Sequence, residues 1–231
     1  MSSGSPVLLI LGSGANIGQS AARAFHSKGY KIALTSRKPN QEHSPDGYVN
    51  ISSDLSDPES VVQVFSEVKE KLGIPSVVVY NAGAASKNDA NDPLSLSLAD
   101  FVRDLSVNTT SAFVAGQQAV SGFAQLSDSA SKTFIFTGNI LNTTIIAPLL
   151  SLGVGKSATA HMIQSAASAY AERGFQFYYA DERKTDGSPA YFDVDGDAHA
   201  THYVQLAEAR EQGPWQQTFT KGVGYKNFLT T

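Results

Sequence analysis

The sequence contains no cysteine, and this absence excludes several functions at once. Disulfide frameworks, thiolate nucleophiles, zinc fingers and iron–sulfur clusters all require that residue. Charged residues are also scarce, because 17 Lys and Arg and 21 Asp and Glu make up only 16% of the 231 residues. The formal net charge of −4 and the lack of any long basic run make nucleic acid a poor candidate partner.

Long apolar runs are absent as well. No stretch reaches the roughly 18 apolar residues of a membrane-spanning helix, and residues 1–6 lack the basic region and apolar run of a secretory signal. We therefore expect a cytoplasmic protein with no membrane partner. Hydrophobic residues form 42% of the chain, which is ordinary for a globular protein, and a chain of this length can bury a substantial core.

Short apolar runs alternate with amphipathic segments along most of the chain. Residues 6–11 form a continuous apolar run, which is typical of a strand covered by helices on both faces of a parallel sheet. We predict strands at residues 6–11, 30–36, 48–53, 76–80, 133–137 and 175–179, and helices at residues 19–28, 58–72, 98–126, 156–173 and 201–212. Six strands alternating with helices indicate an α/β, single-domain Rossmann fold over residues 1–231, with a doubly wound, mostly parallel sheet. Residues 181–231 are expected to form a substrate-side loop, a helix and the C-terminal segment.

A glycine-rich turn follows the first predicted strand and leads directly into a helix. It reads Gly12-Ser13-Gly14-Ala15-Asn16-Ile17-Gly18. Unpaired backbone N–H groups at such a turn form a site where a pyrophosphate can bind. Gly12 permits the tight turn and Gly18 allows the helix to pack closely on the strand, although an ordinary strand–helix connection would use glycine in the same way.

This turn and several later motifs resemble the short-chain dehydrogenase/reductase family. The usual opening of that family is Thr-Gly-x-x-x-Gly-Ile-Gly, whereas residues 11–18 read Leu-Gly-Ser-Gly-Ala-Asn-Ile-Gly, with Asn16 in place of the middle glycine. Asp54-Leu55, Asn81-Ala82-Gly83 and Asn108 match further family motifs in order. The resemblance covers residues 7–180 and implies a bound nicotinamide cofactor. It assigns cofactor binding to Gly12, Ser13, Asn16, Ile17, Gly18, Asp54, Leu55, Asn81, Ala82 and Gly83.

The end of the second predicted strand bears on the choice between NAD and NADP. An acidic side chain there accepts hydrogen bonds from a ribose 2′-hydroxyl and repels a 2′-phosphate. This chain has Ser36-Arg37-Lys38 instead, and Arg37 can pair with a 2′-phosphate through charge-assisted hydrogen bonds. A solvated surface arginine is the alternative. We predict NADP(H) as the cofactor, with Ser36 and Arg37 in its site.

The catalytic positions depart from the family pattern. The family uses a Ser after the fifth strand and a Tyr-x-x-x-Lys sequence on the next helix, and no Tyr-x-x-x-Lys occurs in this chain. The resemblance places Asn139 at the Ser position, Leu152 at the Tyr position and Lys156 at the Lys position, with Asn108 retained. Leu152 supplies no proton, whereas Asn139 can donate a hydrogen bond to a substrate oxygen and Lys156 can keep its ribose contact.

Ionisable residues after the sixth predicted strand are candidates for the missing acid. Asp181, Glu182 and Arg183 occupy the position where the family commonly has Pro-Gly, at the carboxyl end of a strand. Asp181 or Glu182 can act as an acid if desolvation raises its pKa, and we include Asp181 in the catalytic set. A solvated loop with an Arg–carboxylate pair is the alternative. The acidic residues 193–197 with His199 and His202 lack the spacing of a metal site, so we expect no metal.

These features predict an NADP(H)-binding oxidoreductase that transfers hydride to or from a small organic molecule, with a non-standard proton donor. Two alternatives remain open. One is a redox-neutral isomerase or cyclase that uses the cleft to orient its substrate, and the other is a nucleotide-binding protein without turnover. Small residues on the helix at 156–173 allow close helix–helix approach, so we also predict a homo-oligomer, a dimer or a tetramer.

Overall fold

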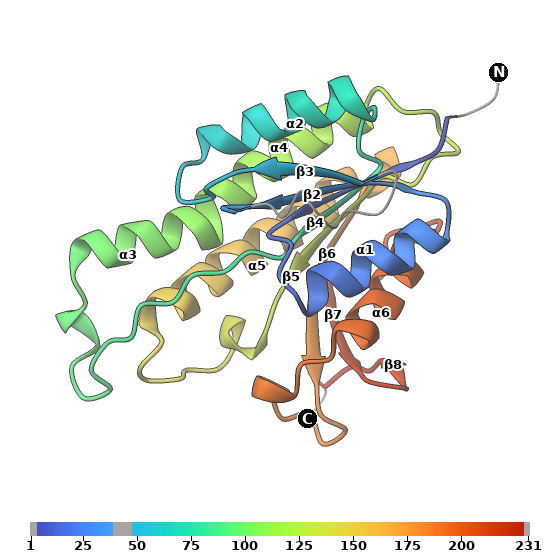
Figure 1. Cartoon of the computed structure of the whole chain (residues 1–231). Coiled ribbons are helices and arrows are strands. Elements are labelled where there is room, and N and C mark those ends of the chain that lie inside the picture. The colour runs from blue at the N-terminus through green and yellow to red at the C-terminus, as the bar shows by residue number, and fades with distance from the viewer. Residues whose placement is uncertain (1–3, 39–47, 229–231) are drawn as a thin grey trace.

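A mostly parallel sheet forms the centre of the computed structural model, which describes residues 4–38 and 48–228 (Figure 1). Its strand order is β3-β2-β1-β4-β5-β6-β7-β8, and only β8 runs antiparallel to its neighbour. This order confirms the predicted doubly wound, single-domain Rossmann fold. The strands are β1 (Val7–Leu11), β2 (Lys31–Ser36), β3 (Tyr48–Ser52), β4 (Val77–Tyr80), β5 (Thr133–Thr137), β6 (Gln176–Arg183), β7 (Gln216–Thr220) and β8 (Gly224–Tyr225).

Helices cover both faces of this sheet, as Figure 1 shows. The helices are α1 (Ile17–Ser27), α2 (Glu59–Lys71), α3 (Leu98–Leu105), α4 (Ser111–Phe123), α5 (Leu150–Tyr170) and α6 (Gly196–Glu208). One buried cluster joins α2, α4 and α5 to one face of the strands, and a second joins α1 and α6 to the other face. Because both faces are covered, the central strands are apolar throughout, as the unbroken run in β1 predicts.

The C-terminal half of the sheet extends further than the sequence predicts. The strand predicted to end at residue 179 continues to Arg183, because β7 pairs with its last five residues. The sequence pattern predicts no strand at β7, because four of its five residues are polar and resemble a loop, yet all five are buried. The ionisable residues predicted to follow the sixth strand therefore lie within it.

Three helices also differ from their predicted bounds, and one of them, predicted at residues 201–212, is α6 at Gly196–Glu208. The long helix predicted at residues 98–126 is divided into α3 and α4 by a π-helical turn at Ser106–Thr110, which contains Asn108. A π-helical turn inside a helix is frequently found at a functional site. The helix predicted to begin at residue 156 begins at Leu150, so that Leu152 and Lys156 lie on successive turns of α5. Among the described residues, no helix is both long enough and apolar enough to cross a membrane.

Two glycines on α5 give a matched test of how closely this helix packs. A Cβ on Gly155 would lie 2.6 Å from Cβ of Asn108, whereas a Cβ on Gly153 would have no atom within 4 Å. We expect Gly155→Ala to lower the free energy of unfolding by about 1–3 kcal/mol, the range for overpacking. Gly153→Ala should raise it by about 0.5–1 kcal/mol through helix propensity. Urea unfolding followed by circular dichroism measures both, and equal effects would contradict the close contact with Asn108.

Candidate active site

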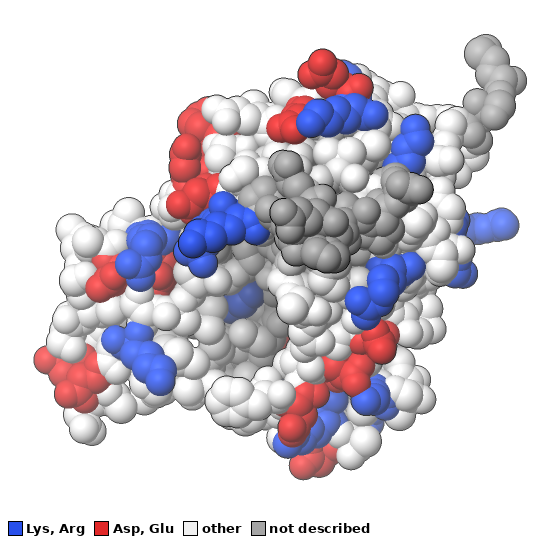
Figure 2. All heavy atoms as spheres, viewed as in Figure 1, with Lys and Arg blue, Asp and Glu red and all other residues white. Residues whose placement is uncertain are grey.

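Two adjoining cavities lie beside the carboxyl ends of the parallel strands. The inner cavity has a volume of about 510 Å³ and the outer cavity a volume of about 580 Å³. They meet at the glycine-rich turn and at the end of β4, where both are lined by Gly14, Asn81, Ala82 and Gly83. Figure 2 shows this face of the molecule hollowed, with basic side chains around the hollow. The two cavities together form one elongated cleft.

Close backbone contacts explain the glycines of the turn. Gly12 has φ +91°, and a Cβ there would lie 2.7 Å from the backbone N of Ala82. A Cβ on Gly18 would lie 2.7 Å from Cα of Ser13, so α1 could not approach the turn so closely with any other residue. The backbone N–H of Ser13 donates to the carbonyl of Thr35 at 2.8 Å. The turn is therefore fixed against both β2 and β4.

Asn16 links the turn to the segment after β6. Its Nδ2 donates to the carbonyl of Val194 at 2.8 Å, and a Cβ on Gly196 would lie 2.5 Å from its Oδ1. Asn81 fixes the turn from the other side, because its Nδ2 donates to the carbonyl of Gly12 at 2.8 Å. Ile17 lines the inner cavity next to Asn16. Asn16 therefore serves as a contact between two chain segments that the sequence alone does not bring together.

The outer cavity contains the residues predicted to lie near adenine and ribose. Ser36, Arg37, Asp54 and Leu55 all line it. Hydrogen bonds from Ser56 hold the pKa of Asp54 below its usual value, and the charge of Arg37 acts in the same direction. Burial opposes this shift only weakly, because the Asp54 side chain is exposed. The carboxylate therefore stays ionised at neutral pH.

Arg103 also lines the outer cavity, although the sequence does not mark it as a site residue. Its guanidinium pairs with Asp100 at 2.8 Å and with Asp104 at 3.2 Å, and it donates to the Ser86 hydroxyl at 2.5 Å. In the sequence, an arginine beside two aspartates on a helix is indistinguishable from an ordinary solvated ion pair.

Asn108 is fully buried and lines neither cavity. Its Nδ2 donates to the carbonyl of Ala84 at 2.7 Å, and its Oδ1 accepts from the N–H of Ala84 at 3.1 Å. Its own carbonyl accepts from the Thr159 hydroxyl at 2.7 Å. The side chain thus joins the segment after β4 to the π-helical turn. Asn108 therefore contributes to the cleft by holding these two segments in place, and not by lining it.

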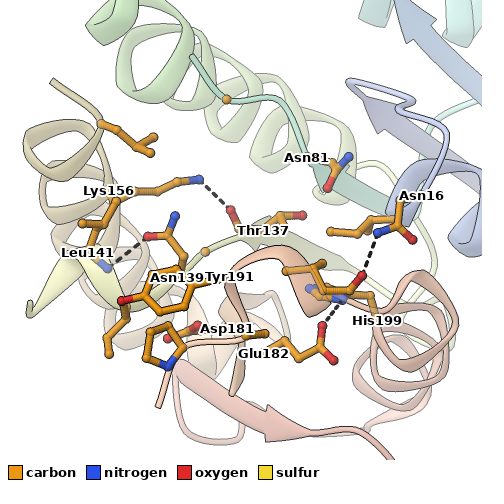
Figure 3. Close-up of a pocket in the computed structure, with 18 of the residues that line it drawn as sticks. Asn16, Asn81, Thr137, Asn139, Leu141, Lys156, Asp181, Glu182, Tyr191 and His199 are labelled. Atoms are coloured by element: carbon orange, nitrogen blue, oxygen red, sulfur yellow. Dashed lines mark hydrogen bonds and ion pairs between the residues drawn. The ribbon is translucent and has the colours of Figure 1, made fainter. Parts of the chain in front are cut away.

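Lys156 extends from α5 to the floor of the inner cavity (Figure 3). Its Nζ donates to the carbonyl of Thr137 at 2.8 Å and lies 4.4 Å from the centre of the Phe136 ring. Burial lowers the pKa of Lys156 to about 8, although the charge of Asp181 opposes the shift. Leu152 lines the cavity one turn earlier on the same helix. An ammonium group and an apolar side chain therefore stand side by side on this wall.

Asn139 follows β5 and forms the next part of the wall. Its Oδ1 accepts from the N–H of Leu141 at 3.0 Å, which begins the short helix at Ile140–Asn142. Its backbone N–H and carbonyl both contact the Tyr179 hydroxyl, at 3.1 and 2.7 Å. Since the carbonyl side of the amide is occupied by Leu141, the Asn139 amino group is the part that can donate to a bound oxygen.

Strand alternation places the charged residues of β6 on opposite faces. Tyr179 packs with the cluster beneath α5 and Ala180 with the cluster beneath α6. Residues two apart point to the same face, so Asp181 and Arg183 point to the α5 face and Glu182 to the α6 face. This alternation explains why Asp181 lies near Lys156 and Glu182 contacts α6.

Asp181 and Arg183 form a buried ion pair. Both Nε and Nη2 of Arg183 lie 2.6 Å from Oδ2 of Asp181, and the two residues are 7% and 1% exposed. Burial raises the pKa of Asp181, and the guanidinium of Arg183 opposes that shift. The pairing expected in a solvated loop is present, but both partners are buried at the edge of the cavity, where desolvation acts on the carboxyl group.

Glu182 and His199 form a second buried contact at the other end of the inner cavity (Figure 3). Nδ1 of His199 lies 3.3 Å from Oε2 of Glu182 and 2.9 Å from the carbonyl of Asp195. Because both neighbours are acceptors, Nδ1 carries the proton. Burial lowers the pKa of His202 to about 4, so that ring is neutral at pH 7. Within residues 4–38 and 48–228, no three potential metal ligands gather.

The sequence does not identify most of the apolar residues that line the inner cavity. They come from two segments, the one between β5 and α5 and the one between β6 and α6. They are Ile140, Leu141, Ile146, Leu149, Pro189, Tyr191 and Val194. No sequence motif marks them, because an apolar residue in a loop looks the same whether it faces a cavity or solvent.

Comparisons with known proteins agree with this architecture. The family model described as enoyl-(acyl carrier protein) reductase matches residues 12–178. The short chain dehydrogenase/reductase dmxR12 of Cryptosporiopsis sp. is 48% identical, over 97% of this chain and 95% of its own length.

Two solved structures share the fold at lower sequence identity. ElxO with NADP bound has a TM-score of 0.78 at 16% identity and covers 94% of this chain and 97% of its own. A short-chain dehydrogenase/reductase family oxidoreductase from Brucella ovis, in complex with a partially ordered NAD, has a TM-score of 0.73 at 17% identity, over 93% and 99% of the two chains. Together with the fixed glycine turn and the cleft beyond β4, the match over nearly the whole length of dmxR12 makes this chain a member of the short-chain dehydrogenase/reductase family.

Proposed function

We propose that the protein is an NADP(H)-dependent oxidoreductase that transfers hydride to or from a small organic molecule. The observation that carries this proposal is the continuous cleft formed by the two cavities, which meet at the glycine turn. The NADP in ElxO and the NAD in the Brucella ovis protein show that this fold holds such cofactors in other proteins. In this arrangement Asp181, Glu182, His199 and the segment between β6 and α6 contribute to the substrate side of the cleft.

The shape of the cleft fits a dinucleotide. Gly14 lines both cavities, and a Cβ there would have no protein atom within 4 Å. The backbone of Gly14 is therefore directly exposed to the cleft. The N–H groups at the start of α1 can bind the pyrophosphate. Asp54 and Leu55 would then hold the adenosine half in the outer cavity. Ile17 and Asn81 would hold the other half in the inner cavity.

The residues of the inner cavity can serve the chemistry around a bound nicotinamide. NADPH supplies the hydride. Lys156 would contact the nicotinamide ribose, and Asn139 would donate a hydrogen bond to the substrate oxygen, where negative charge develops. Asp181 would supply the proton, because burial raises the pKa of its carboxyl group, while the ion pair with Arg183 acts in the opposite direction. Leu152 offers no proton, and its apolar side chain would contact the body of the substrate.

Arg37 is the residue that favours NADP over NAD. It lies at the end of β2 in the outer cavity, where a ribose 2′-phosphate would lie. Arg103 lines the same cavity, but its charge is already balanced by Asp100 and Asp104. We therefore assign recognition of the 2′-phosphate to Arg37, with Ser36 beside it.

Replacement of Arg37 tests this assignment. Arg37→Ala should weaken NADPH binding by about 1.5–3 kcal/mol, the value of a hydrogen bond to a charged group, and leave NADH binding nearly unchanged. Isothermal titration calorimetry with both cofactors measures the difference. Arg23→Ala is the control, because Arg23 lies on α1 outside both cavities and pairs with Asp197. Equal losses for NADPH and NADH would exclude Arg37 as the phosphate contact.

Asp181→Asn tests the proton donor. A general acid acts in its protonated form, so the wild-type rate should fall as pH rises through the pKa of Asp181. The Asn variant should lose about 10²–10⁴-fold in kcat, the contribution of a positioned acid, together with that pH dependence. Asp128→Asn, at an exposed residue paired with Lys132, is the control.

The Asn variant also leaves Arg183 without a counter-charge, so its folding needs a separate measurement. Circular dichroism at the assay temperature compares the folded fraction of the variant with that of the wild type. A folded Asp181→Asn variant with the parental rate and pH profile would show that the carboxyl group is a spectator.

Two other functions would use the same cleft differently. A redox-neutral isomerase or cyclase would bind the cofactor without oxidising it, and a nucleotide-binding regulatory protein would bind it with no turnover. Leu152, with no ionisable group, favours these alternatives. Anaerobic mixing with NADPH and a panel of ketones, imines and activated alkenes separates them from the reductase, because only the reductase removes the absorbance of NADPH.

We also propose a homodimer formed through α4 and α5. A shallow apolar depression lies between these helices, lined by Phe113, Val120, Met162, Ala166 and Tyr170. Phe113 is 49% exposed, and an apolar depression of this kind is typical of an interaction surface. Light scattering at micromolar concentration should give at least twice the chain mass of 24.5 kDa, and Phe113→Glu should lower it. A monomer in the wild type would contradict the proposal.

A further inference from the structure

The inner cavity has a polar end beside α5, apolar walls, and the buried Glu182–His199 pair at its other end. Lys156, Asn139 and Asp181 gather at the polar end. Leucine side chains, among them Leu141 and Leu152, line this cavity, and Tyr191 lines it from the segment between β6 and α6. Such a compartment matches a substrate with one oxygen at the buried end and an apolar body.

Tyr191 has a strained backbone. It has φ +50°, and among the described residues it is the one non-glycine position with a positive φ. The left-handed conformation is unfavourable for a bulky residue, and such strain concentrates at functional sites where the surrounding structure maintains it. In the view of Figure 3 the Tyr191 ring is drawn next to Asn139 and Leu141, and all three residues line the inner cavity.

Hydrogen bonds hold the segment that carries Tyr191. Nη1 of Arg183 donates to the carbonyl of Gly187 at 3.0 Å, and Arg183 forms a β-bridge with Pro189. Nζ of Lys184 lies 2.9 Å from Asp193. Asn16 then holds Val194 beyond the far end of the segment. The ring therefore belongs to a segment fixed before any ligand binds, which lowers the entropy lost on binding.

The ring of Tyr191 is placed for contact with a ligand. Its side chain is 60% exposed, and among the described residues its hydroxyl has no hydrogen-bond partner. The neighbouring Phe192 is fully exposed and does not line the cavity. An aromatic ring that lines a cavity favours flat ligands, because stacking needs a planar partner. A flexible chain would also lose more conformational freedom in the same slot.

We propose that Tyr191 selects the substrate, and that the substrate is a flat cyclic ketone whose body stacks on the Tyr191 ring while its oxygen lies at Asn139 and Asp181. This inference rests on the proposed function, because that function places the reacting oxygen at the polar end. Tyr191 is a positioning residue in this arrangement, and the ring rather than the hydroxyl carries the selectivity.

Two ketones with the same number of carbon atoms test the proposal, namely bicyclic 2-tetralone and open-chain 2-decanone. Their dissociation constants for the NADP⁺-bound protein are measured by ligand-observed NMR, which requires no turnover. The wild type should bind 2-tetralone more tightly. Tyr191→Leu, which keeps an apolar side chain without a ring, should reduce that preference about three- to tenfold, the range of one aromatic contact.

Two matched variants complete the experiment. Tyr191→Phe should keep the preference, since the ring remains, and Phe192→Ala should keep it because that side chain lies outside the cavity. Thermal unfolding of each variant checks the fold. Equal binding of the two ketones by the wild type, binding of neither, or an unchanged preference in folded Tyr191→Leu would overturn the proposal.

The experiment distinguishes a failure of the proposed reductase function from a failure of the role proposed for Tyr191. Preferential binding of 2-tetralone without oxidation of NADPH would contradict the proposed reductase and support the role of Tyr191. Oxidation of NADPH with no preference between the ketones would do the reverse. A loss of kcat in Tyr191→Phe without a change in KM would assign the hydroxyl to proton transfer and overturn the positioning role.

Discussion

The buried ion pair between Arg183 and Asp181 is the contact on which the cavity depends. One guanidinium holds the carboxylate through Nε and Nη2 and the carbonyl of Gly187 through Nη1. It thereby connects the end of β6 to the segment that returns over the cleft. Removing one partner of a buried pair leaves an uncompensated charge, at a cost of about 3–5 kcal/mol. The pair therefore supports the segment that borders the cavity and also opposes the rise in the pKa of Asp181 that burial causes.

The extension of β6 is what makes this pair possible. Pairing with β7 matches Asp181 with Thr218 and Arg183 with Thr220, and it satisfies the backbone of a charged segment inside the protein. The alternation of the strand then separates the two carboxylates. Asp181 faces Lys156 across the α5 side, while Glu182 contacts His199 on the α6 side. Two adjacent acidic residues consequently lie in different environments, and only Asp181 acts on the polar end of the cavity.

The sequence was sufficient to predict the fold and many of the residues that line the outer cavity. Apolar strands such as β1 and the glycine at position 12 carry local signals, because burial on both faces and a positive φ each restrict the residue type. Asn139, Lys156 and Asp181 of the inner cavity are also identifiable from the sequence, but its apolar lining could not be predicted in the same way. β7 is polar although buried, and Tyr191 occupies its conformation because distant residues hold it. Signals of that kind arise from tertiary contacts, which no local pattern records.

The hydrogen bond from Asn16 to Val194 has a consequence for how two ligands communicate. It runs from the glycine-rich turn to the segment that carries Tyr191, so both halves of the cleft share one contact. Gly196 packs against the backbone of Asn16 and makes this junction rigid. In the proposed arrangement, a displacement of the turn by one ligand would therefore also displace the segment that carries Tyr191. Any such coupling would be reciprocal by thermodynamic necessity, so each ligand would change the affinity for the other by the same factor.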